Sequence, residues 1–340
     1  TAILARSLGI PAVVGCGNLL QHVQPGQVIG LDGALGSIWL QPDDSQRQQL
    51  LQQRQQWLDQ QGAASGAAQQ PATLRDGKRI VIAANLVSPD EVPQALALGA
   101  EGVGLFRSEF LYMGRNSPPS EDEHYAANVT VAQALGKLPL IVRTLDIGGD
   151  KPVPYLGLTA EANPFLGWRG IRFCLDRPDL FKPQLRALLR AGVEYNIQIM
   201  FPMVSTVTEV QQARQLLAAV QAELQATGLP TGERMPVGIM VETPAAVLMA
   251  DHLAHEVDFF SVGTNDLTQY TLAADRSNTR VAGLVNSLQP AVVHSIHQVV
   301  QAAHRAGIWA GVCGEIASNP AVAALLVGLG DDELSMTPAA

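Results

Sequence analysis

The segment from Phe259 to Asp266 changes character halfway along its length. Phe259 to Val262 is apolar and favours a β-strand, whereas Gly263-Thr264-Asn265-Asp266 is polar. Adjacent Asn and Asp side chains at the end of a strand could hold a metal ion and a ligand carboxylate, and Gly263 would let the backbone come close to that ligand. The same residues could instead form an Asx turn or a helix N-cap. The residues at the ends of the other predicted strands must therefore decide between a functional site and a simple helix cap.

Four further apolar segments also end in polar or ionisable residues. These ends are Phe106-Arg107-Ser108-Glu109, Arg143-Thr144-Leu145-Asp146, Val241-Glu242-Thr243 and Cys313-Gly314-Glu315. Folding requires none of these groups, so their recurrence favours a site.

Five cations follow these strand ends or lie in the loops beyond them: Arg107, Arg143, Lys151, Arg169 and Arg276. Any one of them could simply pair with a nearby acid at the surface. Five together predict a small, strongly anionic substrate, because a guanidinium group binds a phosphate or a carboxylate through two parallel hydrogen bonds.

Glu242 and Asp266 end successive predicted strands and could share one Mg²⁺, completed by phosphate oxygens of the substrate. Alternatively, each acid pairs with one of the arginines. Cys313 lies between Gly311 and Gly314, where the backbone could approach a ligand, and its thiol could donate or accept a proton at carbon. The alternative for Cys313 is a small buried hydrophobic residue.

Strand-like segments that alternate with helical patterns must position these residues. The segments are Ile80–Ala84, Gly102–Phe106, Leu140–Leu145, Ile197–Pro202, Val237–Val241, Phe259–Val262, Ile308–Val312 and Leu334–Met336. Their order predicts an α/β protein with a (β/α)₈ barrel of the TIM type, which places functional groups at the carboxyl ends of its strands. An open doubly wound sheet is the alternative, but it normally has a Gly-rich phosphate loop after its first strand, and Asn85-Leu86-Val87-Ser88-Pro89 stands there instead.

Residues 71–340 form the predicted barrel, and two segments precede it. Residues 1–40 contain a helical pattern at 1–9 and short apolar segments at 27–33 and 36–40, which predict a small, partial α/β piece. Residues 41–70 are a predicted linker, with a polar helix over 42–61 and a flexible joint over 62–70.

The composition excludes several classes of protein. A net charge of -9 in 340 residues disfavours a broad basic surface for nucleic acid. The three cysteines are far apart and predict reduced thiols in the cytoplasm. Neither a signal peptide nor an apolar segment long enough to span a membrane is evident.

Six longer motifs resemble Enzyme I of the bacterial sugar phosphotransferase system, the phosphoenolpyruvate-protein phosphotransferase family. The Asp-Ile-Gly-Gly-Asp-Lys loop is more similar to Enzyme I than to pyruvate phosphate dikinase or phosphoenolpyruvate synthase. The motifs begin at Gly102, Arg143, Asn163, Gly238, Gly263 and Cys313.

The resemblance implies a role for each candidate residue. Arg107, Arg143 and Arg276 would hold phosphoenolpyruvate together with Asn265 and the backbone of Asp266, while Lys151 and Arg169 would join the phosphate-binding set. Glu242 and Asp266 would bind Mg²⁺. Cys313 would protonate C3 of the enolate to give pyruvate.

Residues 1–15 resemble the segment that follows the phosphorylated histidine of the family's swivelling domain. We therefore expect that this histidine, the domain that docks the histidine-containing carrier protein and the last barrel helix lie outside the 340 residues. Such a chain would bind phosphoenolpyruvate and Mg²⁺ without phosphorylating itself, and the resemblance implies a homodimer formed through the barrel. A dikinase or synthase barrel and a non-catalytic, phosphoenolpyruvate-sensing barrel are the alternatives.

Overall fold

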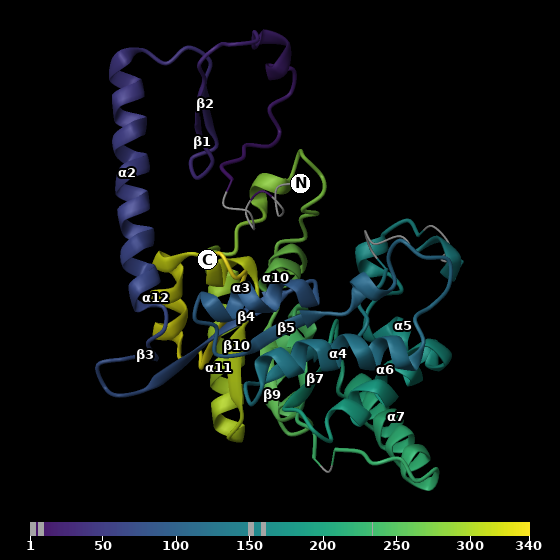
Figure 1. Ribbon diagram of the computed structural model, residues 1–340. Helices are drawn as coiled ribbons and strands as arrows, with labels where there is room; N and C mark the ends of the chain where they lie inside the picture. Colours follow the sequence, from purple (N-terminus) through teal and green to yellow (C-terminus); the bar gives the residue numbers. More distant parts are fainter. Residues whose placement is uncertain (1–4, 6–9, 149–152, 158–160, 233) are drawn as a thin grey trace. The chain divides into compact units, whose positions relative to one another are not determined.

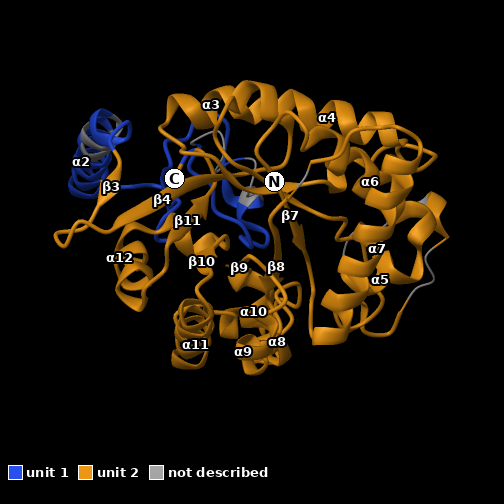
Figure 2. Cartoon of the chain, turned by 90° about the horizontal axis from the view of Figure 1, so that it is seen from below, with its two compact units in different colours: residues 1–70, 339 blue, residues 71–338, 340 orange. Residues whose placement is uncertain are grey.

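The computed structural model describes residue 5 and residues 10–148, 153–157, 161–232 and 234–340 (Figure 1). The chain divides into two compact units, Thr1–Gln70 with Ala339 and Pro71–Pro338 with Ala340 (Figure 2). Each unit has its own secondary structure and is described by itself.

The first unit contains a short hairpin and one long helix. After the 3₁₀ turn η1 (Leu19–His22), β1 (Gly30–Asp32) pairs antiparallel with β2 (Ser37–Trp39). Helix α2 (Asp44–Ala67) begins with a capping box, in which the side chain of Asp43 accepts the backbone N–H of Gln46. The helix continues through residues 62–67, so the prediction of a flexible joint there was wrong. The predicted helix over residues 1–9 lies almost entirely outside the described residues.

The second unit is a closed barrel of parallel strands. Its strands are β4 (Arg79–Leu86), β5 (Val103–Arg107), β6 (Leu140–Arg143), β7 (Ile197–Phe201), β8 (Val237–Val241), β9 (Phe259–Val262), β10 (Trp309–Val312) and β11 (Glu333–Met336). Each strand pairs with the next in chain order, and β11 pairs in turn with β4, with Glu333 opposite Val81. A short strand, β3 (Ala72–Thr73), adds antiparallel to β4. The closure confirms the predicted (β/α)₈ barrel and excludes the open sheet.

Helices follow the strands around the outside of the barrel (Figure 2). Among the described residues, no helix is both long and apolar enough to cross a membrane. Residues 244–253 form two short helices, because the backbone leaves the helical conformation at Met249. The helices are α3 (Val92–Ala97), α4 (Glu121–Leu135), α5 (Ile171–Asp176), α6 (Pro178–Ala191), α7 (Val207–Ala226), α8 (Pro244–Leu248), α9 (Ala250–Leu253), α10 (Thr264–Thr271), α11 (Pro290–Ala306) and α12 (Pro320–Leu329). Short 3₁₀ turns complete the loops: η2 (Pro89–Glu91), η3 (Glu109–Leu111), η4 (Pro154–Leu156), η5 (Pro164–Leu166), η6 (Ala282–Leu284) and η7 (Glu315–Ser318).

The barrel strands bury both of their faces, as parallel strands covered by helices do. A large apolar cluster, which includes Phe173, Leu188 and Val210, packs the strands against the helices. A smaller cluster of alternate strand residues fills the inside of the barrel: Leu105, Ile141, Met200, Met240, Phe259 and Cys313, with Trp309 packed against it. Cys313 is therefore an interior residue at the end of β10.

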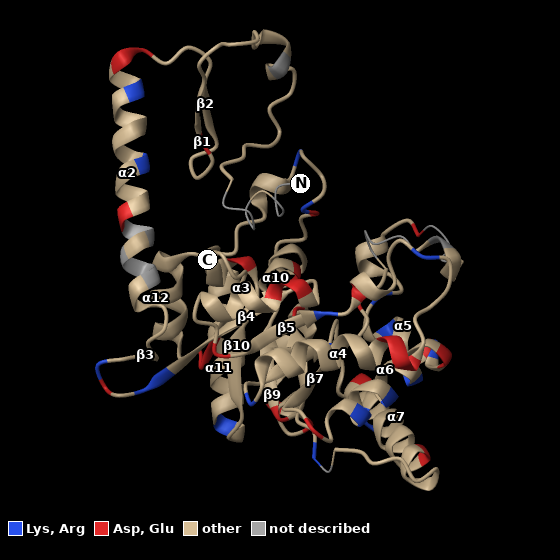
Figure 3. Cartoon of the chain, viewed as in Figure 1, with Lys and Arg blue, Asp and Glu red and all other residues tan. Residues whose placement is uncertain are grey.

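Charged residues of both signs are interspersed over the outer helices (Figure 3). Arg190 on α6 pairs with Glu121 on α4 at 2.6 Å, and Arg305 on α11 pairs with Asp251 on α9 at 2.6 Å. Ion pairs at the surface, where the charged groups keep contact with water, contribute about 0–1 kcal/mol each. The buried ion pairs at the end of the barrel are of a different kind, because both of their partners have lost water.

Candidate active site

Five strands of the barrel deliver polar groups to one end. Arg107 and Arg143 are the last residues of β5 and β6, Glu242 directly follows β8, Asp266 lies in the first turn of α10 after β9, and Cys313 follows β10. Parallel strands have their carboxyl ends on the same side, so the fold alone brings these residues to one rim.

Arg143 is held between two carboxylates. Its side chain is buried, it hydrogen-bonds to Glu109, and its Nη1 lies 3.2 Å from Oδ2 of Asp146. Burial alone would lower the pKa of Arg143, but the two carboxylates outweigh it and hold the pKa above its ordinary value. Nε of Arg143 is also buried and has no hydrogen-bond partner among the described residues. One donor of this guanidinium therefore remains available.

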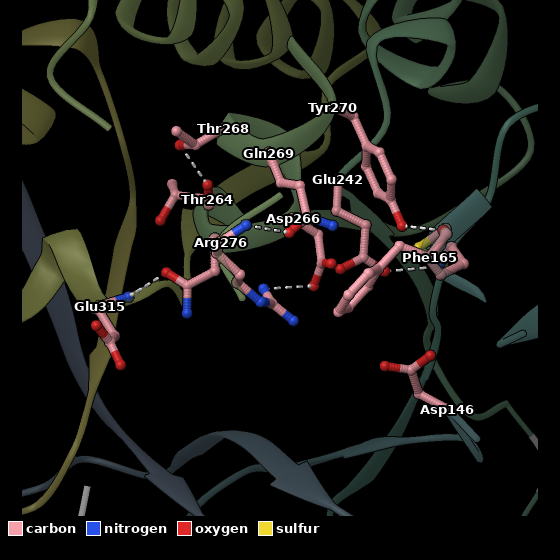
Figure 4. Close-up of polar contacts among 12 residues, drawn as sticks. Asp146, Phe165, Glu242, Thr264, Asp266, Thr268, Gln269, Tyr270, Arg276 and Glu315 are labelled. Atoms are coloured by element: carbon pink, nitrogen blue, oxygen red, sulfur yellow. Dashed lines mark hydrogen bonds and ion pairs between the residues drawn. The ribbon is translucent and has the colours of Figure 1, made fainter. Parts of the chain in front are cut away.

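Arg169 joins two of the loops at the rim. Its Nε and Nη2 donate to the two oxygens of Asp146 at 3.3 and 3.0 Å, and its Nη1 donates to Asp266 Oδ1 at 3.1 Å and to the Tyr270 hydroxyl at 3.2 Å. Burial is again opposed by the carboxylates, and the pKa of Arg169 is raised. Tyr270 donates its own hydroxyl to the carbonyl of Phe165, which ties α10 to η5 (Figure 4).

Arg276 approaches Asp266 from the opposite side. Its Nη1 lies 3.5 Å from Oδ2 of Asp266, and its guanidinium carbon lies 5.4 Å from the centre of the Phe165 ring (Figure 4). The side chain of Arg276 is about one third exposed, so it can reach a ligand from the solvent side. Oδ1 of Asn265 accepts the backbone N–H of Glu315 at 3.3 Å and thereby connects the loops after β9 and β10.

Arg107 is the exception among the four described arginines of the site. It makes no ion pair with any described residue, and burial together with the neighbouring Arg143 lowers its pKa. Two adjacent guanidinium groups repel each other unless an anion lies between them. Arg107 is therefore a cation whose partner the folded chain does not supply within the described residues.

The carboxylate of Glu242 is buried among other acids. Its Oε1 accepts the backbone N–H of Met203 at 2.6 Å, and burial, with Asp266 and Asp146 nearby, raises the pKa of Glu242 to about 8. In Figure 4 the Glu242 and Asp266 side chains point into the same space. A buried carboxylate next to another is stabilised by a cation.

Glu242 and Asp266 provide some, but not all, of the ligands that a hard cation needs. Glu242 and Asp266 offer oxygen ligands of the kind that Mg²⁺ prefers. Within the part of the chain that the structure describes, no three His, Cys, Asp or Glu side chains are grouped closely enough to hold a metal ion by themselves. The residues therefore fit Mg²⁺ if the ligand supplies further oxygens.

The Cys313 thiol lies at the inner edge of the site. It is 3% exposed, and its sulfur lies 3.6 Å from the carbonyl oxygen of Val262. Burial raises the pKa of Cys313 to about 11, although Arg143 and Arg107 oppose the shift. At neutral pH the group is therefore a thiol, which can donate a proton.

The structure brings together all but one of the predicted site residues: Lys151 lies outside the described residues. Asp146 and Glu109 were not predicted as site residues, although both stand in the quoted strand ends. Spacing was a signal for Asp146 alone, which follows its partner Arg143 by three positions, whereas Glu109 pairs with Arg143 from the end of another strand. Pairing of the arginines with acids was the alternative to a binding site. The structure shows such pairs among the site residues themselves, so the two interpretations are compatible.

Comparison with known proteins gives concordant matches over almost the whole chain. Residues 61–340 match the family profile described as PEP-utilising enzyme, PEP-binding domain, and residues 1–36 match PEP-utilising enzyme, mobile domain. Proteins named phosphoenolpyruvate-protein phosphotransferase from Bacillus sp. (strain S) and Geobacillus stearothermophilus are each 48% identical over 99% of this chain, and one from Staphylococcus carnosus (strain TM300) is 45% identical over 99%. The chain spans 58% of the length of the first two relatives and 59% of the third.

Proposed function

The chain belongs to the PEP-utilising enzymes through its PEP-binding domain, and we propose that it is the phosphoenolpyruvate-binding barrel of a phosphoenolpyruvate-protein phosphotransferase. The observation that carries the proposal is Arg107, a cation without an acid partner among the described residues, beside an Arg143 that retains an unused donor. Two such groups at the end of a barrel are suited to a phosphate or carboxylate group.

The balance of charge supports a strongly anionic ligand that arrives with a cation. Four arginines of the site face four carboxylates, Glu109, Asp146, Glu242 and Asp266. Phosphoenolpyruvate adds a phosphate of about −1.5 to −2 charges and a carboxylate to this nearly balanced set. Mg²⁺ bound with it would restore the balance.

The resemblance of the sequence to Enzyme I, together with the positions of the described side chains, supports the following individual roles. Arg107 and Arg143 would bind the phosphate from the β5 and β6 ends, and Arg276 would close over the ligand from the loop after α10. Asn265 and the backbone of Asp266 would contribute hydrogen bonds. Arg169 would support the phosphate side. The resemblance of the sequence assigns Lys151, which lies outside the described residues, to the same set. Glu242 and Asp266 would hold Mg²⁺, which when bound supplies positive charge to the departing phosphate.

Cys313 is suited to donate the proton that the reaction product needs. When the phosphoryl group leaves, the enolate of pyruvate must gain a proton at C3. A buried thiol with a pKa of about 11 holds its proton at neutral pH and delivers it to a carbanion-like carbon inside the barrel. The thiolate would then regain a proton from water.

In the whole protein we propose that the phosphoryl group passes to a histidine and then to the histidine-containing carrier protein. Homodimerisation through the barrel and a cytoplasmic location are further parts of this proposal. They rest on the resemblance of the sequence and on the names of the relatives.

Calorimetric titration of the chain with phosphoenolpyruvate, with and without Mg²⁺, tests the proposal. We expect saturable binding that tightens when Mg²⁺ is present, and a Glu242→Gln variant that loses the effect of the metal. Glu194→Gln, which changes an exposed carboxylate, is the matched control. Binding that is indifferent to Mg²⁺, or no binding of phosphoenolpyruvate, would overturn the proposal.

A further inference from the structure

We propose that Asn85 is a positioning residue that fixes the backbone of Cys313 and thereby aims its thiol at C3 of the bound enolate. The inference rests on the proposed function and assigns a role to a strand residue that contacts neither substrate nor metal in that proposal. The evidence is the geometry at the closing seam of the barrel, which we define as the place where β4 pairs with β11.

The side chain of Asn85 is fully engaged in hydrogen bonds. Asn85 is buried in β4; its Nδ2 donates to the carbonyl oxygen of Cys313 at 2.8 Å and to that of Ser335 at 3.2 Å, and its Oδ1 accepts the Ser335 hydroxyl at 2.6 Å. The opposite orientation of the amide would place its oxygen against two carbonyl oxygens, so the surrounding groups determine which way it points. Asn85 therefore connects β4 to the ends of both β10 and β11.

A β-bulge lies beside Asn85, with its extra residue, Gly104, in the neighbouring strand β5. Ala84 lies opposite Val103, but Asn85 lies opposite Leu105, so the register between β4 and β5 shifts at Asn85. Bulges occur often beside active sites.

The backbone of Cys313 is held on both sides. Its N–H donates to the carbonyl of Val262 at 3.1 Å, and the ladder between β10 and β11 ends one residue earlier, with Val312 opposite Leu334. Asn85 supplies the hydrogen bond to the Cys313 carbonyl at the point where the strand has ended. With the N–H and the carbonyl both fixed, the direction of the Cα–Cβ bond is fixed as well.

Such precision matters for transfer of a proton to carbon. In the proposed step the S–H bond of Cys313 breaks, a C3–H bond forms from the enolate electron pair, and C2–O becomes the carbonyl of pyruvate. The rate of such a step depends on the distance and alignment of donor and acceptor, and a displacement of an ångström can cost about 100-fold.

Ketonisation of enolpyruvate isolates this step, because it needs no phosphoryl acceptor. Enolpyruvate is released from phosphoenolpyruvate by a phosphatase, and its conversion to pyruvate is followed with and without the chain in the presence of Mg²⁺. Wild type, Cys313→Ala, Asn85→Ala, Asn85→Asp and Ser335→Ala are compared. Calorimetry gives the Kd for phosphoenolpyruvate, and thermal unfolding gives the stability of each variant.

We expect wild type to accelerate ketonisation and Cys313→Ala to lose the acceleration. Asn85→Ala should be slower than wild type by roughly 10- to 100-fold, with the Kd for phosphoenolpyruvate unchanged within about twofold. Asn85→Asp keeps the shape of the side chain but cannot donate to the Cys313 carbonyl when ionised, so its rate should recover as the pH falls. Ser335→Ala loses one bond at the same seam and leaves the Cys313 contact in place, so it should retain the wild-type rate.

Two results would overturn the inference alone. One is wild-type rates in Asn85→Ala and Asn85→Asp, and the other is a loss in Ser335→Ala equal to that in Asn85→Ala, which would show a purely structural role at the seam. If wild type is no faster than Cys313→Ala, the proposed proton donor itself fails, and the inference fails with it.

Discussion

Arg107 and Arg143 lie next to each other, yet their pKa values shift in opposite directions. Arg143 has Glu109 and Asp146 as partners, and its pKa is raised. Arg107 makes no ion pair with a described residue, and its pKa is lowered, first by burial and then by Arg143. Glu109 and Glu315 offset this lowering only in part, so an anion bound beside Arg107 would still be favourable.

Replacing Arg107 should therefore separate binding from stability. We expect Arg107→Ala to weaken phosphoenolpyruvate binding about 10- to 100-fold, because a hydrogen bond to a charged group contributes about 1.5–3 kcal/mol. The free energy of unfolding should stay the same or rise, since a repelled cation is removed. Calorimetry and urea unfolding measure the two effects.

Arg143→Ala is the matched comparison for Arg107→Ala. It leaves Glu109 and Asp146 without this guanidinium and should lower the free energy of unfolding by about 3–5 kcal/mol. Equal losses of stability in the two variants would contradict the distinction between them.

Sequence reasoning could identify most of these residues but not their pairing. A charged residue at the end of an apolar segment is visible in the sequence, and the barrel then assigns it to one rim. Whether an arginine is free or paired depends on side-chain geometry across loops, as between Arg169 and Asp266, which are far apart in the chain. The sequence therefore could not show that Asp146 bridges two arginines.

Helix α10 and the loop after β10 fit closely together. Gly314 leaves room for Thr264 at the start of α10, since a Cβ on Gly314 would lie 1.8 Å from the Thr264 hydroxyl oxygen. This approach allows Asn265 to accept the N–H of Glu315. The absence of a side chain at Gly314 thus lets the start of α10, which carries Asp266, pack against the loop that carries Cys313.

We expect Gly314→Ala to force these two elements apart. The overpacking should lower the free energy of unfolding by about 1–3 kcal/mol and weaken phosphoenolpyruvate binding, because the α10 end of the site moves. Thermal unfolding and calorimetry measure the two effects, and an unchanged Gly314→Ala would show that the two loops adjust independently.

Gly328→Ala is the matched control for Gly314→Ala. Gly328 lies within α12, and no described atom outside the backbone of its own helix would lie within 4 Å of a methyl group added there. Alanine at this position should raise the free energy of unfolding by about 0.5–1 kcal/mol, because glycine loses more conformational freedom than alanine in a helix.

Secondary-structure elements were predictable where the pattern of apolar residues is clear, and they were not predictable where only the local composition could be used. The β8 and β9 strands have the predicted bounds. Residues 62–67 are rich in Ala and Gly, yet the capped α2 helix extends through them, because alanine favours helix once the helix has begun.

At the scale of the whole molecule, the barrel was predictable because eight strand–helix alternations admit few topologies. Closure itself, the pairing of β11 with β4, joins residues about 250 positions apart and cannot be read from local patterns. The residues that fill the inside of the barrel are harder still to predict, because they include a carboxylate, a group that is usually exposed to solvent. Glu333 is buried inside the barrel, where Gly104 leaves space for its Oε1, and burial raises its pKa to about 8.

This buried acid predicts how the stability of the molecule depends on pH. The pKa of Glu333 rises from an ordinary value of 4.5 in the unfolded chain to about 8 in the fold, so between these values the folded state binds more protons. Its stabilisation is present below pH 4.5 and is lost as the pH rises toward 8, by at most about 1.4 kcal/mol per unit. Glu333→Gln remains neutral, so its free energy of unfolding should exceed that of wild type increasingly from pH 5 to pH 8, whereas exposed Glu194→Gln should follow wild type. Urea unfolding across this range measures the difference; parallel curves for wild type and Glu333→Gln would mean that Glu333 ionises in the fold as it does in water.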